Sequence, residues 1–146
     1  MGIVELNSEA HAIRLELFDA FPQYEEQLRK VRFAWGAGMT RAAGNARSNS
    51  GLIKFSKELW TINPPDNFRN TVLHEIAHVI VGWQEQHGPV WVRVAKEIGC
   101  TGERYHTLEV PHAYVPCSRC GQPCRVSSRR FANYKRGRQY RHRTCP

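Results

Sequence analysis

No apolar run in this 146-residue sequence approaches the ~20 residues that a bilayer-spanning helix requires. The first residues are charged and lack an apolar core followed by a cleavage site, so we expect no secretory signal. The five cysteines form an odd set, which argues against a disulfide framework and for a reducing compartment. We therefore expect a monomer that is not secreted, enters no membrane and works inside the cell, in the cytoplasm, nucleoid or nucleus.

Acidic residues are absent after Glu109: all 13 lie between Glu5 and Glu109. Nine of the 21 lysines and arginines follow Val110, and they account for the whole net charge of +8. Such asymmetry is typical of an appended module that binds a polyanion. The length fits one ordinary domain plus a small module, so we predict a domain over residues 1–110 and a basic module over residues 111–146.

The hydrophobic spacing predicts a mixed α+β domain with a small antiparallel sheet. Ser8 is the expected cap of a first helix, and the apolar, β-branched stretches indicate strands separated by glycine turns. The expected elements are a helix over 8–20, strands over 31–35 and 52–56, a helix ending near residue 81, and a helix over 89–98. A proline-bracketed linker is expected over 101–116.

The stretch "HEIAH" at residues 74–78 places two histidines four residues apart. On a helix, His74 and His78 would share one face, about one turn apart, and both imidazoles could reach one zinc ion at ~2.0–2.1 Å. Glu75 would lie beside them, as the general base of a metallopeptidase does. The residues expected to form the buried stripe of this helix are Leu73, Ile76, Ala77 and Ile80.

A catalytic zinc normally has three protein ligands and one open position. His87 is the best candidate for the third ligand, because it follows His78 by nine residues, past Gly82, where the chain can turn back. Glu85 and His106 are the alternatives. A solvated helix with incidental polar residues is the competing interpretation of the whole stretch.

"HEIAH" followed by "HGPVW" resembles the SprT (Spartan-type) family of zinc metallopeptidases, in which HExxH is followed by a third histidine in an HG-x-x-W setting. His87, Gly88 and Trp91 match that setting, and the residues over 41–60 are similar to the two strands that precede the family's active helix. The resemblance covers roughly residues 8–146. It implies a zincin-like domain that cleaves proteins bound or crosslinked to DNA, whereas the spacing by itself indicates a zinc hydrolase.

The basic module contains "CSRC" at 117–120 and "HRTC" at 142–145, a pairing typical of a zinc ribbon. The predicted ligands of a structural zinc are Cys117, Cys120, His142 and Cys145, with Cys124 as the rival fourth ligand. Ribbons of SprT-like proteins often have four cysteines, so the histidine is a departure from that pattern. The alternative is a flexible cationic tail with incidental cysteines. Two zinc ions per chain are thus expected, one catalytic and one structural.

Basic and aromatic residues alternate between the two knuckles. The cations can neutralise phosphates, and Phe131, Tyr134 and Tyr140 can either stack on unpaired bases or fill the ribbon's small core. Single-stranded or partly single-stranded DNA is the favoured partner. The predicted nucleic-acid contacts are Arg129, Arg130, Lys135, Arg136, Arg138 and Arg141.

These features predict a zinc-dependent endopeptidase that acts on DNA-associated proteins, DNA–protein crosslinks included, and is recruited by its ribbon. Zinc would acidify a water and polarise the scissile carbonyl, and Glu75 would carry the proton to the leaving amine. Tyr105 and His106 are candidates to stabilise the oxyanion, and the strand over 52–56 is expected to offer its edge to an extended substrate. The alternatives are a non-catalytic DNA-binding zinc protein and a peptidase whose tail binds RNA or an acidic protein.

Overall fold

Helix α1 (Ile3–Ala20) opens the chain in the computed structural model, which describes residues 2–145. Its buried residues recur every three or four positions, as one face of an amphipathic helix requires. Ser8 lies inside this helix, where its hydroxyl donates to the carbonyl of Val4 3.1 Å away, so the expected cap at Ser8 was wrong. The buried face consists of Leu6, Ala10, Ile13 and Leu17.

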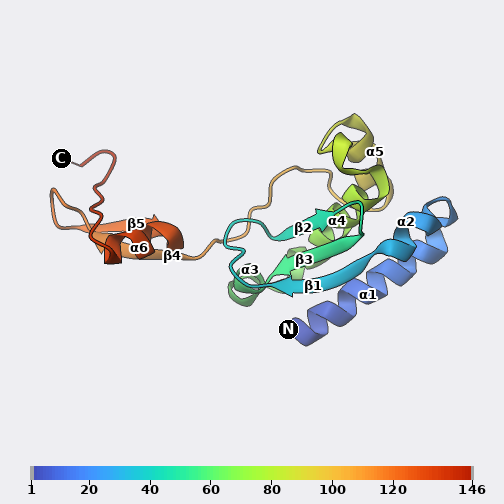
Figure 1. Cartoon of the computed structure of the whole chain (residues 1–146), viewed down its shortest axis with the longest axis horizontal. Helices are drawn as coiled ribbons and strands as arrows, with labels where there is room; N and C mark the ends of the chain where they lie inside the picture. The colour runs from blue at the N-terminus through green and yellow to red at the C-terminus, as the bar shows by residue number, and fades with distance from the viewer. Residues whose placement is uncertain (1, 146) are drawn as a thin grey trace. The chain divides into compact units, whose positions relative to one another are not determined.

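The chain divides into two units, residues 1–109 and residues 110–146, and each has its own apolar core (Figure 1). Among the described residues, the two clusters of buried side chains share no member. The two units are therefore described separately.

A three-stranded sheet in the first unit has the order β1 (Arg32–Gly36), β3 (Leu52–Ser56), β2 (Gly44–Arg47). β3 pairs in parallel with β1 and antiparallel with β2, so the sheet is mixed. The expectation of an antiparallel sheet was therefore wrong for the β1–β3 pair. β3 takes the centre because Ile53 and Phe55 bury their side chains fully. The strand that offers a free edge beside α4 is consequently β2, which corrects the expectation for residues 52–56.

The remaining helices of the first unit surround α4. Helices α4 (Phe68–Val81) and α5 (Pro89–Glu97) agree with the sequence prediction, whereas α3 (Lys57–Ile62) was not anticipated. The Ser56 hydroxyl caps α3 by accepting from the backbone N–H of Leu59 at 3.0 Å. Within residues 2–145 no helix combines the length and apolar character of a membrane span. The elements are η1 (Pro22–Tyr24), α2 (Glu25–Lys30), α3 (Lys57–Ile62), η2 (Pro65–Asn67), α4 (Phe68–Val81), η3 (Trp83–Glu85) and α5 (Pro89–Glu97).

Helix α4 is the centre of the first core. It packs against α1, α2, α5 and β2, and the ring of Phe68 at its start lies 5.0 Å from the ring of Phe55 on β3. Leu73, Ile76 and Ala77 of the predicted stripe are buried, which confirms the helical periodicity. Because α4 is held on several sides, the remaining face, which carries the histidines, has a fixed orientation.

The second unit contains an antiparallel pair, β4 (His112–Pro116) and β5 (Pro123–Ser127), followed by α6 (Ser128–Lys135). The hairpin therefore encloses the first knuckle, and the insert between the two knuckles contains a strand and a helix. Side chains of the pair alternate between two faces. The inner face buries Val115, Cys124 and Val126.

Candidate metal centre and active site

Three histidines of the first unit converge on one point. Nε2 of His87 lies 3.1 Å from Nε2 of His74 and 3.1 Å from Nε2 of His78, and the three ligand atoms are all within 4.8 Å of one another. Two nitrogens bound to one tetrahedral ion at ~2.0–2.1 Å would lie roughly 3.3 Å apart. The donor set and its spacing therefore fit a catalytic zinc with three protein ligands and an open position.

The segment between α4 and α5 delivers the third histidine. Gly82, with φ of 90°, ends α4, and Gln86 has φ of 46°, a left-handed conformation that side chains seldom adopt. Gly88 then donates to the carbonyl of Glu85 at 2.8 Å and closes a tight turn around His87. Strain of this kind persists where the surrounding structure fixes it, often at functional sites.

Trp91 of α5 forms the apolar floor of the cluster. It is fully buried, and its ring centroid lies 4.7 Å from those of His74 and His87 and 5.2 Å from that of His78. One indole thus contacts all three imidazoles and restricts their rotation. This contact explains why a tryptophan follows the third histidine by four residues.

The histidines are uncharged in the folded chain at neutral pH. Burial lowers the pKa of His74 to about 4 and that of His78 to about 3, and the neighbouring imidazoles reinforce both shifts. Burial and the charge of Arg104 also lower the pKa of His87. Because a histidine ligates metal only when neutral, the fold holds all three in the binding form.

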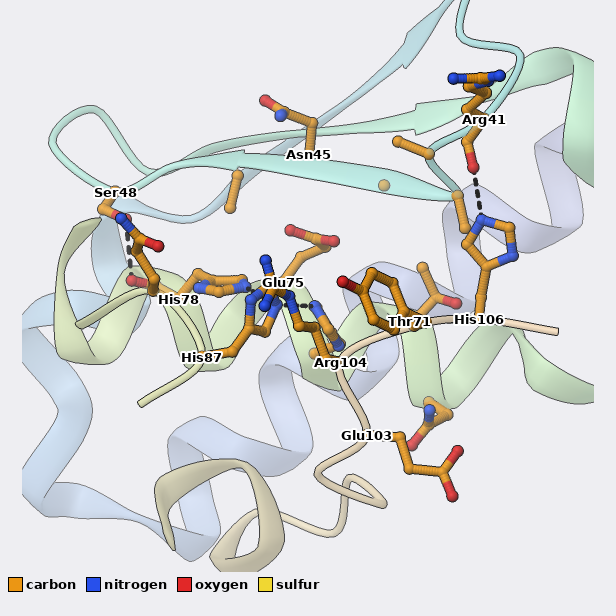
Figure 2. Close-up of a pocket in the computed structure, with 18 of the residues that line it drawn as sticks. Arg41, Asn45, Ser48, Thr71, Glu75, His78, His87, Glu103, Arg104 and His106 are labelled. Carbon is orange, nitrogen blue, oxygen red and sulfur yellow. Dashed lines mark hydrogen bonds between the residues drawn. The ribbon is translucent and has the colours of Figure 1, made fainter. Parts of the chain in front are cut away.

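Glu75 lies between the histidines and strand β2 (Figure 2). Only 6% of it is exposed, and burial raises the pKa of its carboxyl to about 8, against a smaller lowering by hydrogen bonding to the backbone of Ala46. β2 comes this close because residue 44 is glycine: a Cβ at Gly44 would lie 2.9 Å from Cγ of Glu75. The carboxyl is therefore confined beside the cluster, next to a strand edge.

These groups border a cavity of about 560 Å³. Its walls come from the residues before and in β2, from α4, from Trp83, Gln86 and His87, and from residues 103–106 (Figure 2). Of the alternative third ligands, Glu85 does not border this cavity, and His106 borders it but hydrogen-bonds the carbonyl of Arg41. Tyr105, a proposed oxyanion group, also borders the cavity.

The second unit brings its predicted ligands together. Sγ of Cys117 lies 3.7 Å from Sγ of Cys145, and Sγ of Cys120 lies 3.5 Å from Nδ1 of His142. All four ligand atoms are within 4.8 Å of one another. Two thiolates bound to one ion at ~2.3 Å in a tetrahedron would lie roughly 3.8 Å apart, so the group fits a structural zinc.

Two members of this second group have an arrangement that suits a metal ligand. Nε2 of His142 donates to the carbonyl of Pro123 at 2.8 Å, which leaves Nδ1 directed at the cysteines. Hydrogen bonds from the backbone, led by that of Cys120, lower the pKa of Cys117 to about 5. Cys124, the rival ligand, is buried in the core of the unit and is not part of the four-residue group.

Comparison with known proteins agrees with this geometry. Residues 8–113 match the family model described as "SprT-like family". The chain belongs to the SprT-like family. The family recognition and the α+β fold class expected from the sequence are thereby confirmed.

The relatives include proteins from bacteria and from a frog. Protein SprT of Pseudomonas syringae pv. tomato is 29% identical and that of Pseudomonas fluorescens strain SBW25 is 31% identical, each over 116 residues and 70% of both chains. "DNA-dependent metalloprotease SPRTN" of Xenopus tropicalis is 27% identical over 150 aligned positions, which cover 92% of this chain and 34% of that protein. No solved structure matches the chain at a significant level.

The six predicted phosphate contacts of this SprT-like chain are all exposed. The aromatic residues between these cations are not fully exposed for stacking on bases. Phe131, Tyr134 and Tyr140 are partly buried against the core of the second unit. Lys135 lies over the ring of Phe131, 5.0 Å from its centroid, and Arg130 over that of Tyr140 at 5.7 Å. Of the two possibilities left open for these aromatics, the structure favours the core.

A different aromatic residue is exposed in this unit. Tyr114 on β4 is 60% exposed and pairs across the hairpin with Arg125, on the face opposite the buried Val115 and Val126. Its side chain was not among the contacts predicted from the sequence. The alternation of side chains along residues 112–116 could have indicated a strand with Tyr114 on its exposed face, but the prolines at both ends of this segment argued against a strand.

The ionisation of Glu75 predicts a pH-dependent stability difference. Its pKa is about 8 in the folded chain and 4.5 for an unperturbed glutamate, so between these pH values the folded state binds a proton that the unfolded chain has released. Stability is therefore lost as pH rises through this window. Glu75→Gln cannot ionise and avoids the loss, so the metal-free variant should melt several degrees above the parent at pH 8 and close to it at pH 5.

Tryptophan fluorescence can follow this unfolding, because all four tryptophans belong to the first unit. Both proteins would be treated with a chelator and melted at the two pH values. A melting difference that is the same at pH 5 and pH 8 would contradict the assigned burial of the carboxyl.

Proposed function

We propose that the chain is a zinc-dependent endopeptidase that cleaves DNA-associated proteins, including proteins crosslinked to DNA, and that its ribbon recruits it to DNA inside the cell. One observation supports the catalytic part of this proposal. Nε2 of His87 lies 3.1 Å from the Nε2 atoms of His74 and His78, and the three neutral imidazoles lie beside a buried carboxyl on the wall of a cavity of about 560 Å³. A purely structural zinc would need neither the cavity nor the carboxyl.

His74, His78 and His87 would hold the catalytic zinc through their Nε2 atoms. When bound, the ion lowers the pKa of a water molecule and polarises the scissile carbonyl. Trp91 keeps the rings in place beneath it, and the neutral state of the histidines makes their lone pairs available without prior loss of a proton.

Glu75 would take the proton from the attacking water and pass it to the leaving amine. Burial makes its carboxylate a stronger base than an exposed glutamate, with a pKa near the working pH, where a general base is most effective. A divalent cation nearby favours the ionised form, so the carboxylate is present when the site is loaded. Hydrogen bonding to the Ala46 backbone keeps it in position.

Strand β2 would hold the substrate. It is an edge of the sheet, and Gly44, Asn45 and Ala46 border the cavity next to the carboxyl. An extended polypeptide can add to such an edge through backbone hydrogen bonds, which select little side-chain identity. This mode suits an enzyme whose substrates share an association with DNA and not a sequence.

The second unit would bind DNA through its cations. It carries nine basic residues and no acidic residue after Val110, and its structural zinc would be held by three cysteines and one histidine. The relative from Xenopus tropicalis is named a DNA-dependent metalloprotease, and it aligns with 92% of this chain. That name and the charge together support DNA over RNA or an acidic protein as the partner.

The first prediction concerns metal content. Fully loaded protein should contain two zinc ions per chain, because the two donor groups differ in chemistry and lie in separate units. Cys117→Ser should lose one ion and unfold mainly the second unit, since zinc supplies the folding energy of so small a module. Elemental analysis and tryptophan fluorescence, which reports only the first unit, would test this; one zinc in loaded parent protein would remove one of the two sites.

The second prediction concerns catalysis. Glu75→Gln should retain both zinc ions but cleave a DNA-bound protein roughly 10²–10⁴-fold more slowly, the usual contribution of a general base. Fragments would be followed on gels with and without DNA. Cleavage at the parent rate would disprove the role of Glu75, and a parent that binds DNA and zinc but cleaves nothing would favour the non-catalytic alternative.

The third prediction concerns DNA binding. Affinity for single strands should fall steeply with salt, by ~0.7 log units per phosphate contact for each log unit of salt. Replacing Arg129, Arg130, Lys135 and Arg136 with serine should flatten this slope and weaken all sequences alike. An unchanged slope would place the contacts elsewhere in the chain.

Two aromatic substitutions provide the controls for this measurement. Tyr114→Ala should reduce the preference for single strands without changing zinc content, because the ring is exposed. Tyr134→Ala should loosen the zinc site and weaken binding to single and double strands equally, because that ring packs in the core.

A further inference from the structure

The strands of the first unit come from a stretch of sequence that has no acidic residue. Residues 27–57 contain seven lysines and arginines, and all 13 acidic residues of the chain lie before or after this stretch. Residues 1–110 as a whole hold 12 basic and 13 acidic residues, so their sum conceals this separation. The helices around the sheet are acidic in balance, whereas the segment that forms the sheet is basic.

One face of the sheet is filled by core side chains. The ring centroids of Phe33 and Trp35 on β1 lie 5.7 and 5.5 Å from that of Phe55 on β3. His11 of α1 lies 5.1 Å from the ring of Phe33, and Phe68 of α4 lies 5.9 Å from that of Trp35, so both helices cover this side. Successive side chains of a strand point to opposite faces, so the residues between these aromatics belong to the other face.

The basic residues of the three strands share that other face, here called the outer face. Arg32 on β1 and Arg47 on β2 both pair with Leu52 on β3. Two residues along β3, Lys54 pairs with Asn45 of β2, and cross-strand partners point to the same side. Figure 2 shows the side chain of Asn45 directed away from the histidine cluster. Arg32, Arg47 and Asn45 are exposed and Lys54 is partly exposed, so solvent reaches this face.

The three cations of the outer face form a compact group without an acidic partner. Among residues 2–145 the ion pairs are those of Arg29 and Arg69, and Arg32, Arg47 and Lys54 form none. Because adjacent strands lie ~4.8 Å apart, Cα of Arg32 and Cα of Arg47 are roughly 10 Å apart, with Lys54 on the strand between them. Several unneutralised charges of one sign in so small an area attract a ligand with several negative charges.

Protection of the sheet edges does not account for this group. Charged side chains on edge strands prevent one sheet from pairing with another, and β1 and β2 are both edges. Lys54, however, lies on the central strand, where no edge needs protection. Charges of either sign would also serve at an edge, whereas this face has basic residues alone.

DNA is the polyanion that this face fits. A duplex has one negative charge per ~1.7 Å of its axis, so several phosphates would lie opposite the group at once. A protein partner would need an apolar centre to bury, and the outer face offers only the partly buried Leu52 and Ala34. The aromatic side chains of the sheet face the core, so contacts here would be made to phosphates and not to bases.

We propose that the outer face of the sheet is a second DNA-binding surface, on which Arg32, Arg47 and Lys54 contact phosphates. Strand β2 takes part on both of its sides, because Gly44 and Ala46 border the cavity. DNA on the outer face would therefore run along the strand next to the candidate active site, and a protein attached to that DNA would be held close to the cavity. The inference rests on the proposed function only in its choice of DNA, and binding tests it without any cleavage.

Charge removal in the full-length chain tests this surface. The outer-face variant combines Arg32→Gln, Arg47→Gln and Lys54→Gln. The matched control removes three exposed cations of the same unit from helices α4 and α5: Arg69→Gln, Arg93→Gln and Lys96→Gln. Fluorescence anisotropy over a range of salt would give the affinities for labelled duplex and single-stranded DNA, with poly-glutamate as a second polyanion.

The slope of log affinity against log salt is the quantity that decides. The outer-face variant should lower it by ~0.9 per lost contact on the duplex, about 2–3 in all, and by ~0.7 per contact on single strands. Both kinds of DNA should be affected because no base is contacted. The control variant, which loses the same net charge, should keep the slope of the parent.

A second variant separates loss of binding from loss of folding. Asn45→Glu places a carboxylate beside Lys54 on the outer face, and opposite charges on paired strands stabilise a sheet. Its melting temperature should therefore equal or exceed that of the parent, while its slope on the duplex falls by ~0.9, the equivalent of one contact.

The proposal is overturned if the outer-face variant keeps the parent's slope, or if the control variant lowers the slope as much, since net charge alone would then explain the effect. It is also overturned if the outer-face variant binds DNA like the parent but binds poly-glutamate more weakly, because the face would then suit an acidic protein. A chain that shows the expected slopes but cleaves no protein would instead refute the proposed function and leave the second surface in place.

Discussion

The site depends on one constraint: a single stretch of α4 must supply two candidate metal ligands and, between them in sequence, a carboxyl that is kept from solvent. His74 and His78 share one face of the helix, so Glu75 lies on a different side of it, although its carboxyl still borders the same cavity. That side is covered by β2, and the cover is possible only because Gly44 has no side chain to strike the carboxyl. Sheet order, glycine position and carboxyl basicity are thus parts of one arrangement.

Much of this arrangement was predictable because it is local. The four-residue spacing of the histidines, the apolar stripe beside them and the helix end at Gly82 are properties of one helix, and the structure bears them out. The paired knuckles at 117–120 and 142–145 are likewise short-range signals, and their four ligand side chains meet. Side chains three or four residues apart on a helix have few alternative arrangements.

The parts that could not be predicted depend on contacts between distant residues. β3 reads as an ordinary strand, and only the tertiary structure shows that it is central and that the less apolar β2 is the edge. Residues 101–109 have no periodicity, so the sequence gives no indication that His106 meets Arg41, 65 residues away. The cap predicted at Ser8 was wrong because the apolar contacts of Leu6 extend α1 past Ser8 toward the N-terminus. A serine is only weakly unfavourable within a helix, so it does not stop this extension.

Charge divides the two proposed tasks between the units. Chemistry in the first unit relies on buried groups, which solvent ions screen little, whereas phosphate contacts in the second unit are exposed and strongly screened. Salt should therefore change how much enzyme resides on DNA without changing the bond-breaking step. Because tethering raises the local concentration of substrate without any new contact at the site, a peptidase with little sequence preference gains its selectivity from where it is held. If the proposed function holds, loose selection by a strand edge and salt-sensitive affinity of the second unit for DNA would be complementary, because the second would limit which proteins the first can reach.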